Sequence, residues 1–303
     1  MRSIISVVKS DYNNVYHNLQ RAAALAAPLG LASNMTIVIK INFCDCRTPE
    51  TGTITHPLFL DAVLHYLREN FENLKLYIVE SDATVVLADE FIQWLGYVPI
   101  LQKWDAEFVN LSKIRAVNKK IDGRYFKEVP VPEVFETSDF FITIPKPKTN
   151  PMATITCCLK NQFGCLPVVE KNVYHPYLDD VIADVNKAMH PNLCLVDGII
   201  AMGGSQGPAF GVPIPLKAIM CSQDPVATDV FCARLMGFNP WFISYIRKSA
   251  SSGVGSMKYT LKGDTIGKVD FETNKLEYWL LQLGGSLQRR AQKQFREGGG
   301  RHQ

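Results

Sequence analysis

Short apolar runs alternate with amphipathic periods along most of the chain. The run "MTIVIK" at residues 35–40 is rich in β-branched residues, which indicates a strand. In "HPLFLDAVLHYLREN" at residues 56–70, apolar residues recur at helical spacing, and Pro57 suits the first turn. The same alternation predicts strands at residues 3–8, 35–40, 74–80, 106–111, 139–145, 192–199 and 214–221, and helices at residues 11–28, 56–70, 84–95 and 175–188.

One more helix is predicted after the last of these strands. Asp224 suits its N-cap, Pro225 suits its first position, and Gly237 marks its end. Strands that alternate with helices in this way are typical of an α/β fold. The chain is therefore expected to form a mostly parallel sheet with helices on both faces.

The domain organisation is predicted to be simple. A small β insertion is expected at residues 117–131, where the pair Asp122-Gly123 favours a hairpin turn. The sequence shows neither an internal repeat nor an interdomain linker before residue 285. Residues 1–285 are therefore expected to form a single α/β domain.

The charge of the chain is concentrated at its end. The tail from Arg289 holds five of the 32 basic residues and one of the 29 acidic residues, which leaves 27 basic and 28 acidic residues elsewhere. A nucleic-acid-binding protein usually carries a basic stripe on its folded body, so we expect no nucleic-acid partner. Residues 286–303 are predicted to be a basic, disordered tail because a glycine run follows the charges.

The location expected from the sequence is the cytoplasm. The apolar stretch "AAALAAPLGLA" at residues 22–32 is short and follows a polar segment, unlike a signal peptide. No apolar run approaches the roughly 18 residues of a membrane span, so no membrane partner is expected. Eight cysteines in 303 residues are too sparse for a secreted disulfide scaffold.

Polar residues follow several predicted strands. Lys40 ends one strand with Asn42 just beyond it, and Glu80, Lys146 and Asp197 stand at the ends of three others. Ligands of open α/β sheets bind at the carboxyl ends of the strands, so these side chains are candidates for one site. The alternative is that polar residues simply begin loops, as they do in any fold.

The stretch "IPKPKTNPMATITCCLKNQFGCLP" at residues 144–167 concentrates cationic and amide side chains where prolines and a glycine break regular structure. Lys146, Lys148 and Lys160 suit phosphate or carboxylate, and Asn150 and Asn161 add amide donors. Surface solubility is the alternative for Lys148 and Lys171. Lys160 stands among apolar residues, so it requires a partner or a shifted pKa. Lys171 is a further candidate of the same kind.

Two histidines are candidates for proton transfer. His56 in "GTITHP" and His175 in "KNVYHP" both open predicted helices. His56 would act as a general acid or base and Thr55 as an anion donor, with Asp197 orienting one of the imidazoles. The alternative is that Thr55 or His56 only caps its helix.

Metal binding is the competing hypothesis. Asp180 and Asp184 would share one helix face and could bind a divalent cation with Asp197, although a solvated helix face is the commoner explanation for such a pair. Asp229, inside an apolar helix, would need a partner if buried. Cysteines could instead hold zinc or an iron–sulfur cluster, although no C-x₂-C spacing occurs. The candidates are Cys44, Cys46, Cys157, Cys158 and Cys165.

Four strings in order resemble the family of domain-of-unknown-function proteins numbered 362. They are "GTITHP", "IPKPKTN…TCCLKNQFGCLP…K…YHPYLDDVIADV", "LCLVDGIIAMGGSQGPAFGVP" and "DPVATDVFCARLMG", and the resemblance runs from about Thr36 to Gly255. The family has no established activity, and its members are often described as iron–sulfur-associated, some through a separate ferredoxin module. Where the family has histidine after a lysine–threonine pair, this chain has Asn150.

The resemblance implies a set of site residues that overlaps the set derived from strand ends. The matching positions are Asn42, Thr55, His56, Lys146, Lys148, Thr149, Lys160, Asn161, His175, Asp184, Asp197, Asp224 and Asp229. The first hypothesis is an enzyme that binds a small anionic metabolite at the carboxyl edge of the sheet. The second is a metal or iron–sulfur redox protein with a redox partner, and the third is an interaction module that uses the basic tail.

Overall fold

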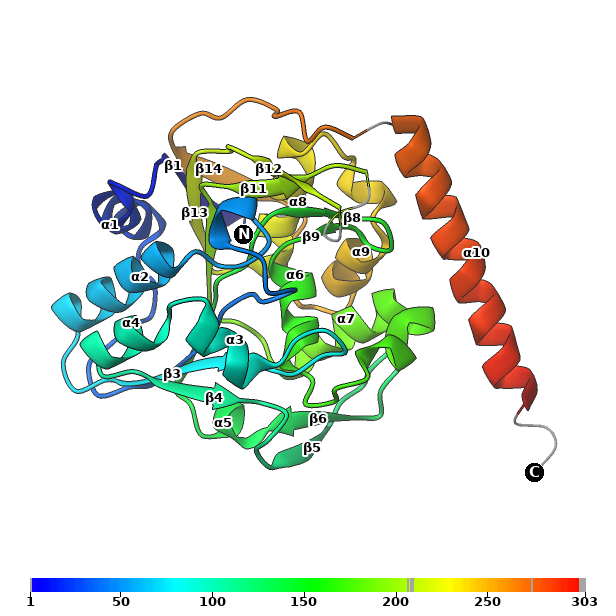
Figure 1. Ribbon diagram of the computed structural model, residues 1–303, viewed down its shortest axis with the longest axis horizontal. Helices are drawn as coiled ribbons and strands as arrows, with labels where there is room; N and C mark the ends of the chain where they lie inside the picture. Colours follow the sequence, from blue (N-terminus) through cyan, green and yellow to red (C-terminus); the bar gives the residue numbers. More distant parts are fainter. Residues whose placement is uncertain (1, 206, 208–209, 274, 300–303) are drawn as a thin grey trace.

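The computed structural model describes residues 2–205, 207, 210–273 and 275–299. Within these residues an eight-stranded sheet runs through the centre of the molecule (Figure 1). Its strands, in spatial order, are β14 (Tyr259–Gly263), β1 (Ser3–Lys9), β13 (Ala218–Ser222), β10 (Leu193–Gly198), β7 (Phe140–Thr143), β2 (Thr36–Lys40), β3 (Lys75–Glu80) and β4 (Glu107–Asn110).

The sheet is mostly parallel, as the sequence predicts. Strands β10, β7, β2, β3 and β4 pair in parallel, and β14 is parallel to β1, whereas β13 is antiparallel to both of its neighbours. The single strand predicted at residues 214–221 is in fact two strands. Lys217 has a φ of 53° just before β13, so the chain turns there and a separate strand precedes it.

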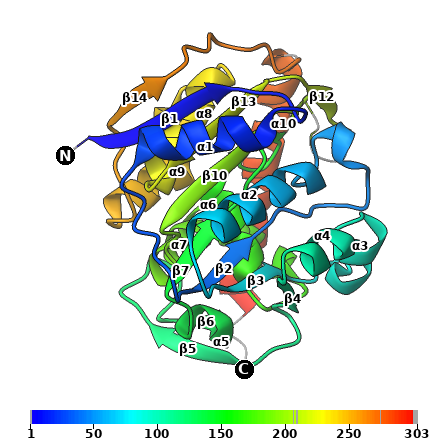
Figure 2. The same cartoon turned by 90° about the vertical axis from the view of Figure 1, so that its left-hand side faces the viewer.

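Helices cover both faces of the sheet (Figure 2). One face packs on helices α1 (Val15–Ala26), α2 (Pro57–Asn70), α3 (Ala88–Trp94) and α4 (Val98–Lys103). The other face packs on α6 (Cys158–Asn161), α7 (Leu178–Ala188), α8 (Pro225–Leu235) and α9 (Ser244–Ser251). Strand β2 shows the two-residue period directly, because Ile37 and Ile39 lie in the first core and Val38 in the second.

The predicted β insertion is confirmed, and a further sheet is present. Strands β5 (Ala116–Lys120) and β6 (Glu128–Pro132) form an antiparallel hairpin, followed by the short helix α5 (Glu133–Glu136). A four-stranded sheet has the order β12 (Val212–Ile214), β11 (Ala201–Gly203), β8 (Lys148–Asn150) and β9 (Thr154–Thr156). The stretch at residues 144–167 is therefore partly strand, in runs too short to show a period.

Some helix boundaries differ from the sequence prediction. Helix α3 begins at Ala88 rather than at residue 84, where the Asp82 carboxylate accepts the Ala88 N–H at 2.9 Å. The helix predicted from His175 opens with the 3₁₀ helix η3 (Lys171–Tyr177) before α7. Helix α8 begins as predicted, with Asp224 accepting the Ala227 N–H at 2.9 Å. Three other 3₁₀ helices are η1 (Pro49–Thr51), η2 (Gln162–Cys165) and η4 (Pro240–Phe242).

Helix α10 (Lys275–Gly299) replaces the disordered tail predicted from residue 286, and it lies at the edge of the molecule (Figure 1). The Arg289 guanidinium donates to the Met152 carbonyl at 2.7 Å, which ties the helix to the β8–β9 hairpin. Residues 300–303 of the predicted tail lie outside the described residues. No helix in the described part of the chain is long and apolar enough to cross a membrane.

The two aspartates predicted to share a cation have separate partners. Asp184 is fully buried and accepts three N–H groups from Arg124, Tyr125 and Phe126 at 2.7–2.8 Å. Asp180 instead forms a half-exposed ion pair with Lys248 at 2.7 Å. Asp184 therefore fixes the loop that joins β5 to β6.

We expect Asp184→Ala to lower the free energy of unfolding by about 3 kcal/mol, because three buried N–H groups lose their acceptor. Asp180→Ala is the matched control on the same helix, and it should change this energy by about 0–1 kcal/mol. Urea denaturation measures both. Equal effects of the two substitutions would contradict the assigned role of Asp184.

Candidate functional site

A cavity of about 350 Å³ opens where β2 and β3 end. Hairpin β8–β9, helix α6 and the 3₁₀ helix η3 complete its walls. The residues that matter for its chemistry are Lys40, Asn42, Cys44, Glu80, Lys148, Asn150, Lys160, Asn161, Phe163, Gly164, Lys171 and His175. We call it the lysine cavity, after Lys40, Lys148, Lys160 and Lys171. Its position at the carboxyl ends of parallel strands is the usual one for a ligand in this fold class.

Lys40 and Glu80 form a closed ion pair in the cavity wall. Their charged atoms lie 2.6 Å apart, and both side chains are buried. Lys40 also donates to the Ile41 carbonyl, and the Glu80 carboxylate accepts the N–H of Phe43 and of Ser81. A side chain at Gly164 would place its Cβ about 3.0 Å from the Lys40 ammonium, so glycine suits this close approach.

Lys148 is held by neutral acceptors. Its ammonium donates to Asn42 Oδ1 at 2.5 Å, to the Thr53 carbonyl at 2.7 Å and to Cys44 Sγ at 3.4 Å. The side chain is only 2% exposed, and no carboxylate in the described part of the chain lies within ion-pair distance. These three acceptors match its three hydrogens, so Lys148 contributes a fixed positive charge.

Two amides connect Lys148 to the central sheet. Asn42 Nδ2 donates to Asn161 Oδ1 at 2.9 Å, and Asn161 Nδ2 donates to Thr143 Oγ1 at 2.9 Å. The chain of hydrogen bonds links the end of β2, helix α6 and the end of β7. It fixes the cavity wall, because each amide is held at both its oxygen and its nitrogen.

Lys171 is also held by neutral groups. Its ammonium donates to the Asp82 carbonyl at 2.6 Å and to the Val168 carbonyl at 2.7 Å. Burial lowers the pKa of Lys171 to about 8. This lysine is a second positive charge in the cavity that lacks a carboxylate within ion-pair distance among the described residues.

Lys160 differs from the other three lysines. It is half-buried, and within the described ranges its ammonium has neither a hydrogen bond nor an ion pair. The Lys160 nitrogen lies over the Phe163 ring, 5.8 Å from its centroid. Burial, followed by the positive charge of Lys148, lowers the pKa of Lys160 to about 8.

His175 lines the same cavity from η3. Its ring lies 6.3 Å from the Phe163 ring, centroid to centroid. Burial, followed by the positive charge of Lys160, lowers the pKa of His175 to about 4. The imidazole is therefore neutral at neutral pH, and it is a weaker base than an ordinary histidine until an anion in the cavity offsets the charge of Lys160.

The other predicted catalytic residues lie in a separate group, the Asp197 cluster of Tyr12, His56, Lys146 and Asp197. Asp197 accepts from Lys146 Nζ at 3.0 Å, from the Tyr12 hydroxyl at 3.0 Å and from the His56 backbone N–H at 2.9 Å. Lys146 and Asp197 are fully buried. Asp197 does hold His56, but through its backbone rather than through its ring.

The imidazole of His56 has a capping contact. Its Nδ1 accepts the Leu58 N–H at 3.1 Å at the start of α2, and its ring stacks on Tyr12 at 3.8 Å between centroids. Burial lowers the pKa of His56. The capping alternative raised from the sequence thus accounts for this geometry, and the lysine cavity does not include His56.

Three of the polar residues predicted in the binding region make internal contacts. Thr55 Oγ1 accepts the Asn42 N–H and donates to the Ile144 carbonyl, both at 2.9 Å. Thr149 donates to the Gly204 carbonyl at 2.8 Å. The Asn150 side chain accepts N–H groups in the β8–β9 turn, although it also lines the cavity.

The predicted cysteines divide into separate environments. Cys44 lines the cavity, Cys46 is exposed, and Cys165 is buried with its thiol 3.4 Å from Gln162 Oε1. Burial raises the pKa of Cys44, and it raises the pKa of Cys165 to about 12. Within the described residues, none of these three thiols lies close enough to two other potential ligands to share a metal ion with them.

Cys157 and Cys158 form a group with Asp229. One ligand atom from each lies within 4.8 Å of the others, and all three residues are fully buried. Cys232 adds a sulfur 3.6 Å from Cys157 Sγ. The Asp229 carboxylate accepts long hydrogen bonds, 3.3 Å from Leu159 N and 3.4 Å from the Tyr245 hydroxyl, and burial raises its pKa.

These donors suit a single ion better than a cluster. Two thiols and one carboxyl fit a zinc-like ion, whereas an iron–sulfur cluster is usually held by four thiolates. The sequence indicates Asp229 as a carboxylate inside an apolar helix and as a position that matches the family, but not as a neighbour of the cysteines. Its proximity to Cys157 and Cys158 depends on how α8 packs on α6.

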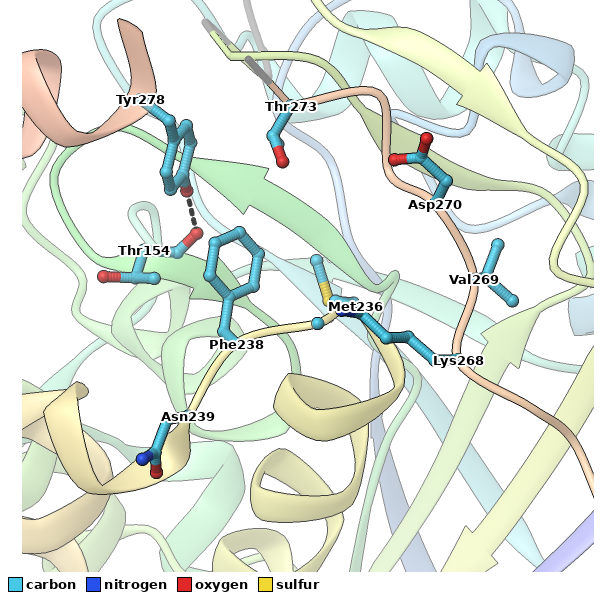
Figure 3. A pocket seen from close by; sticks show the side chains of 10 residues that line it. Thr154, Met236, Phe238, Asn239, Lys268, Val269, Asp270, Thr273 and Tyr278 are labelled. Atoms are coloured by element: carbon cyan, nitrogen blue, oxygen red, sulfur yellow. Dashed lines mark hydrogen bonds between the residues drawn. The ribbon is translucent and has the colours of Figure 1, made fainter. Parts of the chain in front are cut away.

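A larger cavity, of about 620 Å³, lies elsewhere (Figure 3). Met236, Phe238 and Val269 give it an apolar wall, and the Tyr278 hydroxyl is hydrogen-bonded to the Thr154 carbonyl. None of the sequence-predicted site residues is among its described lining residues. The candidate chemistry therefore lies in the smaller cavity.

The chain belongs to the family described as domain of unknown function (DUF362), whose model matches residues 37–234. A thylakoid-associated protein from Synechocystis sp. is 26% identical over 248 residues, which cover 78% of this chain and 75% of that protein. The family resemblance identified from the sequence is thus confirmed. The family description states no activity.

Two solved structures are similar to this chain, with lower sequence identity than the Synechocystis protein. One is a lactate racemase apoprotein from Thermoanaerobacterium thermosaccharolyticum, with a TM-score of 0.42 and 13% identity, and the match covers 78% of this chain and 57% of that chain. The other is a protein from Thermotoga maritima, with a TM-score of 0.36 and 12% identity, and the match covers 67% of this chain and 53% of that chain. The chain spans little more than half of either structure. Similarity at this level supports no functional argument.

The stability of the protein should depend on the charge of Lys146 but not on the charge of Lys160. Lys146→Met leaves Asp197 buried without a cation, so we expect a loss of about 3–5 kcal/mol in the free energy of unfolding. Lys160→Met removes a charge that has no partner, so the change should be within about 1 kcal/mol. Urea denaturation of both variants checks this. A large loss for Lys160→Met would show that Lys160 is a structural residue.

Proposed function

We propose that the protein is an enzyme whose lysine cavity binds a small carboxylate or phosphate compound. The observation that carries the proposal is an imbalance of charge. Lysines 40, 148, 160 and 171 line the cavity, and the only carboxylate among its described lining residues is Glu80. Because Glu80 is paired with Lys40, the other three ammonium groups have no anionic partner among the residues that the structure describes.

The imbalance of charge affects stability because two of these lysines are buried. A charge removed from water is unfavourable unless it is paired, and Lys148 and Lys171 are both buried among neutral acceptors. An anion in the cavity would compensate these charges where the low dielectric strengthens the attraction. A cavity of about 350 Å³ is within the range for small-molecule sites.

The proposed chemistry is acid–base catalysis. His175 is the candidate proton acceptor, because its neutral imidazole lines the cavity beside Lys160. Asn42, Asn161 and Thr55 would position the wall through their mutual contacts. In this proposal His56 and Asp197 support the fold next to the site rather than transferring protons.

Loss of Lys160 should remove ligand binding. A thermal-shift screen of carboxylated and phosphorylated compounds should find ligands that raise the melting temperature of the wild-type chain, because they bind only the native state. Lys160→Met should reduce the affinity for such a ligand at least about tenfold, since a direct charge-assisted contact is lost. Lys120→Met, at an exposed position in β5, is the matched control.

The same titration at rising pH tests the charge. Lys160 and Lys171 in the free protein lose their protons as the pH rises through about 8. A dicarboxylate such as malonate, whose own charge is constant in this range, should therefore bind progressively more weakly above that pH. No stabilisation by any anion, or an affinity unchanged by Lys160→Met, would contradict the proposal.

A second candidate function is metal binding, favoured by the group of Cys157, Cys158 and Asp229. Protein purified without oxygen should carry about one zinc or iron ion per chain, and the double variant Cys157→Ser, Cys158→Ser should lose it. Cys221→Ser, at a buried thiol of β13, is the control and should retain it. Metal-free wild-type protein would remove this candidate.

Cellular location and protein partners remain predictions. The cytoplasm is the location predicted from composition, and fractionation of cell extracts would test it. A redox partner is expected only under the metal-binding candidate.

A further inference from the structure

The four lysines of the cavity are not equivalent in their hydrogen bonding. Lys40 has a carboxylate and a carbonyl, Lys148 has three acceptors, and Lys171 has two carbonyls. Within the part of the chain that the structure describes, Lys160 has none. Protein acceptors therefore hold the ammonium groups of three of the lysines, and the fourth has a nitrogen that can approach a ligand.

The backbone that carries Lys160 is firmly placed. It belongs to helix α6, where the Leu159 N–H meets Asp229 and the Leu159 carbonyl accepts from Asn186 Nδ2 at 2.8 Å. The next residue, Asn161, is fixed to Asn42 and to Thr143. A nucleophile on such a rigid segment loses little freedom when it reacts.

We infer that Lys160 is a nucleophile whose amine forms an imine with the ketone carbonyl of a small 2-oxo acid. The inference rests on the proposed anion site and adds the substrate class and the role of one residue. A carboxylate directly bonded to the carbonyl carbon would be attracted by Lys148, which lines the same cavity as Lys160. The adjacent carbonyl carbon would then be available to the Lys160 nitrogen, which lacks a hydrogen-bond partner among the described residues.

The environment of Lys160 favours the reactive form of the amine. Desolvation and a neighbouring cation are the two conditions that activate an imine-forming lysine. With a pKa of about 8 instead of 10.5, about one-tenth of the Lys160 side chains are neutral amines at pH 7. An ordinary lysine is neutral about 300 times less often at that pH.

The step balances without a redox partner. The nitrogen lone pair attacks the carbonyl carbon, a C–N bond forms, and the carbonyl π pair moves to oxygen. His175 accepts a proton from the nitrogen and returns it to the oxygen, which gives a carbinolamine. Loss of water, with the second N–H proton leaving as part of it, gives the imine. The net reaction converts an amine and a ketone into an imine and water.

Reductive trapping tests this inference. The full chain is incubated with pyruvate or 2-oxoglutarate and cyanoborohydride, and the product is analysed by intact mass and peptide mapping. We expect one adduct on Lys160, heavier than the unmodified peptide by the mass of the oxo acid less one oxygen atom. Labelling of Lys160 should exceed that of exposed Lys120 by about tenfold or more, because its amine fraction is larger.

Lys160→Arg is the variant that separates binding from chemistry. Arginine retains the positive charge but cannot form the imine, so thermal stabilisation by the oxo acid should persist while the adduct is lost. At saturating oxo acid, which offsets the weaker anion binding at high pH, the rate of imine formation in the wild-type chain should rise as the pH rises through about 8, where Lys160 loses its proton.

The outcomes distinguish the two proposals. Stabilisation by 2-oxo acids without an adduct on Lys160 would overturn the imine and leave the anion site intact. An adduct spread evenly over surface lysines would also overturn it. Absence of both stabilisation and adduct, with every anion tried, would overturn the anion site and the imine together.

Discussion

The site depends on one physical constraint. Lysine side chains are buried at the carboxyl edge of the sheet, and their positive charge exceeds the negative charge of the carboxylates beside them. Lys148 and Lys171 are buried, and their acceptors are amide and carbonyl oxygens and a thiol. Neutral acceptors satisfy the geometry of an ammonium group but leave its charge uncompensated. The free protein holds these cations at an energetic disadvantage that an anionic ligand would relieve. The same buried charges that favour binding of an anion therefore lower the stability of the free protein.

Lys146 shows how a buried lysine in this fold is arranged when it does have a carboxylate partner. Lys146 stands only two residues before Lys148, yet it forms a closed, fully buried pair with Asp197 and lies in another cluster. Asp197 shares a face of β10 with Leu195, which packs in the core that contains α1 and α2. The lysine cavity instead borders α6 and η3. Neighbouring lysines thus differ because Lys146 has a carboxylate at 3.0 Å, whereas the acceptors of Lys148 are neutral.

Much of the fold could be predicted because its signals are local. The β-branched runs of β2 and β3 identified strands, and their ends placed Lys40, Asn42 and Glu80 at one edge, as observed. The pairing of side chains is not local. The sequence could not show that Asp197 would pair with Lys146, or that Asp184 would fix the loop after β5. Strands β8 and β9 have three residues each, too few for a period, and the glycines near the end of α10 resembled a disordered tail.

The central claim is that the lysine cavity is an anion site, and a crystal structure with selenate tests it most directly. The selenium of this dianion is located by its anomalous scattering, independently of any assumption about substrate. We expect a strong selenium peak in the cavity, with an oxygen within hydrogen-bond distance of the Lys160 nitrogen, and loss of that peak in Lys160→Met. Selenate bound only at surface lysines, with none in the cavity at saturating concentration, would contradict the account.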